Sequence, residues 1–212
     1  LSEQGYIFES IDEDGNDYEE TFRRKDFEKN FFNENTNMIF CETFLKNAMI
    51  DPYTGEIGKT LIFCVSQNHA VKITQILNVM ADKIFPNQYN SDFAVQVTSN
   101  VKDSQNMTVN FSNNSLNGQS KINPHYRTSK TRVCVTVGMM STGYDCTDIQ
   151  NICMMRPVYS PSEFIQIKGR GTRKCDFSQS WITKSEIPDH VEPNKEQFNL
   201  LDFFANYEYF EK

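Results

Sequence analysis

The sequence lacks an uninterrupted apolar run of about 18 residues, the length that a helix needs to cross a membrane. Its first residues carry neither a basic segment nor an apolar one, so no secretory signal is expected. The chain also starts without methionine, which we interpret as the mark of a fragment from a longer protein. These absences predict a protein with no membrane partner.

Metal-binding patterns are missing as well. The six cysteines form no Cys-x-x-Cys pair and the three histidines have no ligand-like spacing, so no metal site is expected. Cys64, Cys134 and Cys153 lie within apolar runs that resemble strands. We therefore expect buried, reduced thiols, as in a cytosolic protein.

An excess of positive charge is absent too. The net charge is −7, and residues 1–30 hold ten acidic and four basic residues, so the remainder carries −7 − (−6) = −1. A mildly acidic chain does not resemble a free-standing DNA-binding protein. It can still form one wall of a DNA channel whose basic side lies elsewhere.

A complete phosphate-binding loop is the last absence. Residues 55–60 read Gly-Glu-Ile-Gly-Lys-Thr, but a Walker A loop needs a glycine where Tyr53 stands. Such a loop also follows a strand and opens a helix, because the helix N-terminus supplies the N–H groups. Here a turn comes first and an apolar run follows. We expect a turn that leads into a strand and binds no nucleotide.

The patterns that are present indicate an α/β fold. Apolar runs that suit buried strands alternate with helical patterns, which predicts a RecA-like parallel sheet with helices on both faces. The expected strands are 60–65, 93–98, 132–137, 151–155 and 198–204. Ser66 can cap a helix that Pro86 stops. Residues 112–129, rich in Asn and Ser, look like a long surface insertion.

This α/β domain is expected to span residues 51–212, with residues 1–50 as an extension. Two β-like runs around the Asp-Gly turn at residues 12–16 predict an N-terminal hairpin. Apolar positions between residues 26 and 49 suit one or two amphipathic helices.

The segment from 160 to 173 carries the strongest chemical pattern. Ser160, followed by proline and then glutamate at the third helical position, predicts a helix start. Gln166, Arg170 and Arg173 then follow at i, i+4 and i+7, and on a helix they would point the same way. Two guanidiniums beside an amide suit a polyphosphate. The alternative is a solvated basic helix end.

A second polar group follows the expected strand at 132–137. The loop there carries Ser141, Thr142, Gly143 and Asp145. In open α/β sheets ligands bind beyond the carboxyl ends of the strands, so we expect the loop at that edge. Asp145 could hold a sugar hydroxyl, orient an arginine, or simply cap a turn.

The order of these pieces resembles the second RecA-like domain of superfamily 2 helicases and translocases. The similar stretches are 62–66 (motif IV), Thr98-Ser99, Thr142-Gly143-Tyr144-Asp145 (motif V) and Gln166-x-x-Gly169-Arg170-Gly171-x-Arg173 (motif VI). Within that superfamily, residues 58–70 and 167–173 look like the R (restriction) subunit of type I restriction enzymes. The resemblance extends over nearly the whole chain.

The resemblance implies the second motor lobe of an ATP-dependent DNA translocase. ATP and Mg²⁺ would be bound mainly by a first lobe that this sequence does not contain, so the fragment alone would be inactive. Arg170 and Arg173 would be catalytic, one of them as an arginine finger. The other ATP-binding residues implied are Gln166, Gly169, Gly143 and Asp145.

The resemblance also implies partners. The DNA-binding residues would be Ser66, Thr98, Ser99, Ser141 and Thr142, in contact with the backbone of double-stranded DNA. Further partners would be the first RecA-like lobe and a nuclease domain of the same full-length chain, and methylase and specificity subunits, in a bacterial cytoplasm.

Three alternatives remain at this point. One is a lobe of another superfamily 2 motor, of type III restriction or DNA repair. Another is a free-standing nucleotide- or metabolite-binding α/β enzyme. The third is an interaction module without ATP chemistry that uses the acidic residues 1–30 as a docking arm.

Overall fold

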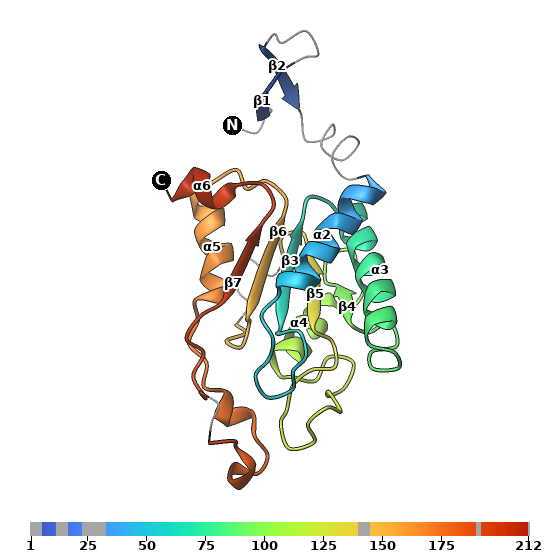
Figure 1. Cartoon of the computed structure of the whole chain (residues 1–212), viewed down its shortest axis with the longest axis vertical. Coiled ribbons are helices and arrows are strands. Elements are labelled where there is room, and N and C mark those ends of the chain that lie inside the picture. The colour runs from blue at the N-terminus through green and yellow to red at the C-terminus, as the bar shows by residue number, and fades with distance from the viewer. Residues whose placement is uncertain (1–5, 12–16, 23–32, 140–144, 190–191, 212) are drawn as a thin grey trace.

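The computed structural model describes residues 6–11, 17–22, 33–139, 145–189 and 192–211 (Figure 1). Three of the expected site residues, Ser141, Thr142 and Gly143, lie outside these described residues. At the N-terminus, β1 (Tyr6–Ile11) pairs antiparallel with β2 (Asp17–Phe22). This pairing confirms the predicted hairpin.

A five-stranded parallel sheet forms the centre of the molecule. Its strands are β3 (Thr60–Cys64), β4 (Ala94–Gln96), β5 (Val133–Thr136), β6 (Asn151–Met155) and β7 (Asn199–Asp202). They lie in the order β4-β5-β3-β6-β7, and every neighbouring pair is parallel. All five expected strands are present, and the α/β fold class is confirmed.

Helices cover both faces of the sheet, as predicted. One face meets α2 (Glu34–Asn47) and α3 (Gln67–Ile84), and the other meets α4 (Ser104–Ser112) and α5 (Pro161–Gly171). A short α6 (Asn206–Phe210) lies beside α5 (Figure 1). Successive strand residues alternate between the faces, so Ile62 packs with the first pair and Leu61 with the second.

Capping residues set the bounds of α3. The Ser66 Oγ accepts a hydrogen bond from the His69 N–H at 3.2 Å, and the helix ends at Ile84, just before Phe85 and Pro86. Its partner α2 contributes Cys41 and Phe44 to the core, although the expected division at residue 50 assigns this helix to the extension. The α/β core therefore includes residues on both sides of position 50.

The Asn-rich region differs from the prediction in two ways. Residues 104–112 form α4, which the sequence did not indicate. Beyond α4, Tyr126 is buried and bridges to Trp181 in an aromatic cluster with Tyr53 and Phe177. The expectation of a simple surface insertion over 112–129 was therefore wrong, because aromatic contacts from distant segments anchor the region.

Lys59 is buried at the amino end of β3 and is not exposed in a loop. Its ammonium donates to the Phe111 carbonyl at 2.6 Å, to Asn114 Oδ1 at 2.9 Å and to Asp148 Oδ1 at 2.8 Å. Burial opposes the charge of Lys59, but Asp148 and Cys146 together outweigh burial and raise the pKa of Lys59 above its ordinary value. The segment before β3 is a structural turn, as predicted.

Five cysteines are buried as free thiols and Cys175 is half-buried, in agreement with the prediction of reduced thiols. Within the described residues, no helix has both the length and the apolar character needed to cross a membrane.

Candidate functional site

The start of α5 follows from its sequence. The Ser160 Oγ accepts from the Glu163 N–H at 3.2 Å, and Pro161 occupies the first helical turn. The Glu163 carboxylate forms an ion pair with Arg156, which follows β6. Phe164 and other buried side chains of α5 pack on the sheet. The helix start predicted at Ser160 is confirmed.

The end of α5 departs from the expected geometry. The helix ends at Gly171, so Arg173 lies beyond it and the i+7 spacing does not place it on the helix face. Arg170 is only 9% exposed, whereas Gln166 is exposed and its Nε2 donates to Ser162 Oγ at 3.4 Å. The three side chains therefore differ in their exposure to solvent.

Arg173 contacts Asp145, the predicted ATP residue that precedes β6. Its guanidinium forms an ion pair with the Asp145 carboxylate, and the two side chains are 37% and 71% exposed. The Asp145 carbonyl in turn accepts from Ser112 Oγ at the end of α4. The structure thus brings together the two segments predicted to be motifs V and VI, in a pair that remains accessible to solvent.

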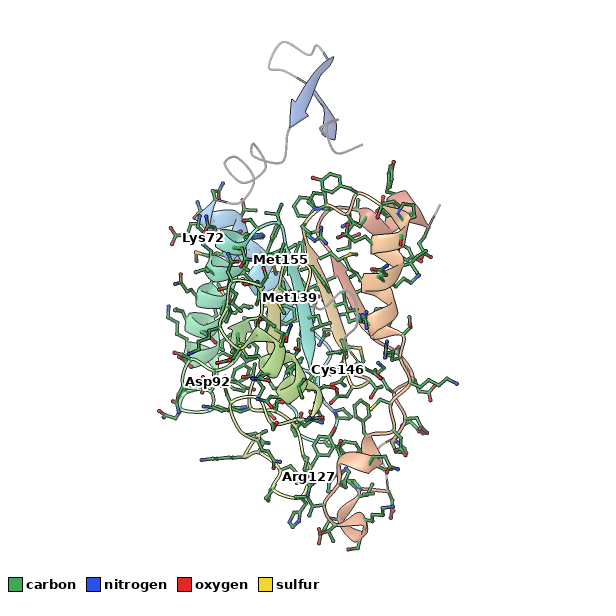
Figure 2. All side chains as sticks on the ribbon, turned by 180° about the vertical axis from the view of Figure 1, so that it is seen from behind. Lys72, Asp92, Arg127, Met139, Cys146 and Met155 are labelled. Carbon is green, nitrogen blue, oxygen red and sulfur yellow. The ribbon has the colours of Figure 1, made fainter. Side chains whose placement is uncertain are left out.

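These residues lie toward the amino ends of the strands. Gln150 N, just before β6, donates to the carbonyl of Lys59, and Asp148 pairs with the Lys59 side chain, so this segment has crossed the sheet. Figure 2 shows Cys146 and Met155 toward opposite ends of the sheet. The expected location of Asp145 beyond the carboxyl ends was wrong, because the loop after β5 returns along the sheet before β6 begins.

The predicted DNA-binding residues that the structure describes lie at the carboxyl ends of β3 and β4. Ser66 is half-buried, Ser99 is exposed, and Thr98 is buried. Two glutamines that the sequence analysis did not single out join them. Gln67 Nε2 donates to Ser99 Oγ at 3.4 Å, and Gln96 Nε2 donates to Thr98 Oγ1 at 3.0 Å.

A third hydrogen bond closes this carboxyl-edge group, which consists of Ser66, Gln67, Gln96, Thr98 and Ser99. Gln96 Nε2 also donates to Gln67 Oε1 at 3.2 Å. The first turn of α3 starts in the same group and contains no acidic residue. Its free N–H groups and the positive end of the helix dipole therefore favour an anion there.

The buried side chain of His69 stabilises this edge of the sheet through hydrogen bonds. Its Nε2 lies 3.1 Å from Asn37 Oδ1, and the Val65 N–H donates to its Nδ1 at 3.4 Å. Since an amide oxygen only accepts, the proton lies on Nε2 and the ring is neutral. Burial lowers the pKa of His69 to about 3, with Lys72 acting in the same direction. The buried histidine links α2, the end of β3 and α3.

Acidic and sulfur ligands do not gather around the site. Within the part of the chain that the structure describes, no group of three or more His, Cys, Asp or Glu side chains could hold a metal ion. Among the described residues near α5, the most exposed ion pair is that of Arg173 and Asp145, and Lys168 of α5 forms a less exposed pair with Glu211.

Comparison with known proteins shows the family to which the fold belongs. A family model described as the helicase conserved C-terminal domain matches residues 38–175. Over 176 residues the chain is 30% identical to the type I restriction enzyme EcoKI endonuclease subunit of Escherichia coli strain K12. This match covers 82% of the chain and 13% of that subunit, so the chain spans a small part of its relative.

Solved structures show the same fold. A fragment of a putative HsdR subunit of a type I restriction enzyme from Vibrio vulnificus YJ016 superposes with a TM-score of 0.54 at 22% identity, over 87% of this chain and 32% of that one. A Dbp5 variant from S. cerevisiae, bound to Gle1 and IP6, gives a TM-score of 0.51 at 14% identity, over 84% and 37%. The RecA-like fold expected from the sequence is confirmed.

Proposed function

Because this chain belongs to the helicase conserved C-terminal domain family, we propose that it is the second motor lobe of the ATP-dependent DNA translocase in a type I restriction R subunit. The relative in Escherichia coli is the endonuclease subunit of such an enzyme. The chain covers 13% of that subunit. A first motor lobe and a nuclease domain would belong to other parts of the full-length protein.

The end of α5 is the observation that carries this proposal. Arg170 lies in its last turn and Arg173 just beyond it, close enough to the loop after β5 to pair with Asp145. Guanidinium stays charged and binds phosphate oxygens in a two-pronged geometry. An arginine that reaches a transferring phosphoryl group raises the rate by roughly 10³–10⁵. The residues present fit a nucleotide triphosphate presented by a partner lobe.

The ion pair of Arg173 and Asp145 would allow a phosphate to take the place of the carboxylate. Solvent-exposed ion pairs contribute about 1 kcal/mol or less, so a phosphate can replace the carboxylate at small cost. Asp145 would hold the guanidinium in place until ATP is bound, and Gln166 and Gly169 would complete this side of the site. Mg²⁺ would be held by the first lobe, which would supply the acidic ligands.

The carboxyl-edge group fits the backbone of one DNA strand. The hydroxyl of Ser99, the amide of Gln67 and the N–H groups at the start of α3 can all donate to phosphate oxygens. Such contacts are independent of base sequence, as a translocase requires. Thr98 is buried and would act through Gln96. Ser141 and Thr142 remain predicted DNA contacts.

The two regions would be coupled through lobe movement. Closure of the lobes on ATP and their reopening after hydrolysis would move duplex DNA along the carboxyl edge. The segment from Thr142 to Asp145 follows β5 and ends near α5, so it would transmit the state of the ATP site. The isolated chain is expected to hydrolyse no ATP, because it contains only one side of the site.

Substitution of the two arginines tests the proposal. In the full-length R subunit, Arg170→Ala or Arg173→Ala should reduce DNA-stimulated ATP hydrolysis by roughly 10³ or more while far-ultraviolet circular dichroism stays unchanged. Arg127→Ala, which removes an exposed arginine from the region after α4, should retain wild-type hydrolysis. Near-normal hydrolysis in both site variants would refute the assignment.

The alternatives make different predictions. A motor of type III restriction or DNA repair would share the arginine phenotype but would not assemble with methylase and specificity subunits. An interaction module would retain its function in the Arg173→Ala variant and lose it when residues 1–30 are removed. The 30% identity to a type I endonuclease subunit favours the type I motor.

A further inference from the structure

Lys195 holds together two segments that are far apart in the sequence. Its ammonium donates to three backbone carbonyl oxygens: Thr147 at 2.8 Å, Gly171 at 2.9 Å and Ile149 at 3.0 Å. An ammonium group has three N–H donors, so these contacts use all of them. Lys195 itself is half-buried and forms no ion pair with another described residue.

The three carbonyls belong to the segments that carry the proposed ATP residues. Thr147 follows Asp145 by two residues, and Gly171 precedes Arg173 by two. The carbonyl of Gly171 is also one of the last four in α5, which have no partner within the helix. Lys195 therefore caps α5 and ties its end to the segment after β5.

The backbone around Lys195 is fixed in turn. Its N–H donates to the Cys175 carbonyl at 2.8 Å, and an isolated bridge joins Asp176 and Asn194. Burial lowers the pKa of Lys195 below its ordinary value, and the Arg173 guanidinium acts in the same direction. The nearby Cys175 and Asp148 act in the opposite direction and partly offset this lowering.

On the basis of the proposed function, we infer that Lys195 is a positioning residue for Arg173. It fixes the end of α5 relative to the segment of Asp145, and so fixes the place from which the guanidinium reaches the phosphates. The hydrogen bonds of the Lys195 ammonium go to backbone carbonyls, so its proposed effect on the phosphates is exerted through Arg173. Displacing a catalytic group by about 1 Å can lower a rate by about 10²-fold.

Replacement of Lys195 in the full-length R subunit tests this role. Lys195→Met keeps the length of the side chain and removes its donors. We expect kcat for DNA-stimulated ATP hydrolysis to fall by roughly 10- to 100-fold, while KM for ATP changes by less than about two-fold. Lys195→Arg, which restores charge and donors, should recover part of kcat. Lys130→Met, which breaks an ion pair with Asp92, is the matched control and should retain kcat.

A double-mutant cycle separates positioning from loss of structure. If Lys195 acts through Arg173, Lys195→Met should cause no further loss of kcat in an Arg173→Ala background. Multiplicative losses of kcat in the double variant would overturn the inference, and so would a wild-type kcat in the Lys195→Met enzyme. In either case, an inactive Arg173→Ala enzyme would leave the motor assignment intact. Active Arg170→Ala and Arg173→Ala enzymes would instead refute the motor assignment, and the inference with it. Thermal unfolding of each variant identifies any that do not fold, and Lys195→Arg then carries the test.

Discussion

The two ends of the parallel sheet present different polar side chains. At the carboxyl ends of β3 and β4, the carboxyl-edge group consists of hydroxyls and amides. All of its members except Ser66 hydrogen-bond to one another. At the amino ends, Lys59 pairs with Asp148, and Arg173 with Asp145. Among the described residues, the ion pair of Arg156 and Glu163 lies at the carboxyl end beside β6, and the pair of Lys168 and Glu211 joins α5 to the residue after α6.

The difference matches the demands of the two proposed ligands. A motor must release each phosphate of the DNA backbone as it advances, which neutral donors allow. A transferring phosphoryl group instead develops charge that must be met by fixed cations. The charged pairs also differ in burial: Lys59 is enclosed, whereas Arg173 is accessible, as the proposed exchange of its carboxylate partner for a phosphate requires.

The largest effect expected at the amino end concerns Asp148. Asp148→Ala leaves the Lys59 ammonium without its carboxylate, although Lys59 is 2% exposed. Removing one partner of a buried pair costs about 3–5 kcal/mol, so the free energy of unfolding should fall by that amount in urea denaturation. Asp92→Ala breaks the more exposed pair with Lys130 and should cost about 1 kcal/mol or less. Equal losses would show that burial does not distinguish the two pairs.

The carboxyl end has its own buried ionisable group. The pKa of His69 is about 3 in the fold and about 6.5 when unfolded, so the unfolded chain takes up a proton first as pH falls. The contribution of neutral His69 to stability is therefore lost below about pH 6.5, by roughly 3 kcal/mol between pH 7 and pH 4. His69→Gln should show a smaller acid-dependent loss in chemical denaturation, while His125→Gln, at an exposed site, should keep the wild-type loss.

Helix caps offer a smaller and more selective test. Ser66 caps α3 and Ser160 caps α5, each through one hydrogen bond of 3.2 Å. Ser66→Ala and Ser160→Ala should each lower the free energy of unfolding by about 1 kcal/mol. Only Ser66→Ala should also weaken DNA binding, measured by fluorescence anisotropy. If both variants weaken it equally, the carboxyl-edge group has no special role.

The smallest effect on stability is expected at Asp145. Asp145→Asn removes an exposed ion pair with Arg173 and should change the free energy of unfolding by about 1 kcal/mol or less. Its ATP hydrolysis should still fall by about ten-fold, because the guanidinium loses its partner before ATP binds. Wild-type hydrolysis in this variant would contradict the role proposed for the pair.

Local signals carried most of the fold prediction. The apolar run at 151–155 coincides with β6, and Ser160 marks the start of α5, because both depend on neighbouring residues alone. Residues 104–112 gave no helical signal, since Met107, Val109 and Phe111 alternate as in a strand and only Phe111 is buried. Contacts of the region after α4 with Trp181 join residues about 55 positions apart, which no local pattern encodes.

The sequence named the residues of the proposed site but did not indicate where they lie in the fold. Arg173 and Asp145 are partners, but the sequence pattern did not reveal that the loop after β5 returns to the amino ends of the strands. The sequence did not indicate a role for Lys195, because its three acceptors are backbone carbonyls, which no pattern of side chains reveals. Gln67 and Gln96 likewise join the carboxyl edge only through folding.

The separate roles proposed for the two ends of the sheet are tested most directly by the rate of ATP hydrolysis at saturating DNA, measured in the full-length R subunit. Ser99→Ala should approach the wild-type rate there, because excess DNA compensates for weaker binding. Arg173→Ala should stay lower by roughly 10³ or more, because DNA cannot replace the guanidinium. If saturating DNA restores the Arg173→Ala enzyme to the wild-type rate, the end of α5 does not complete an ATP site.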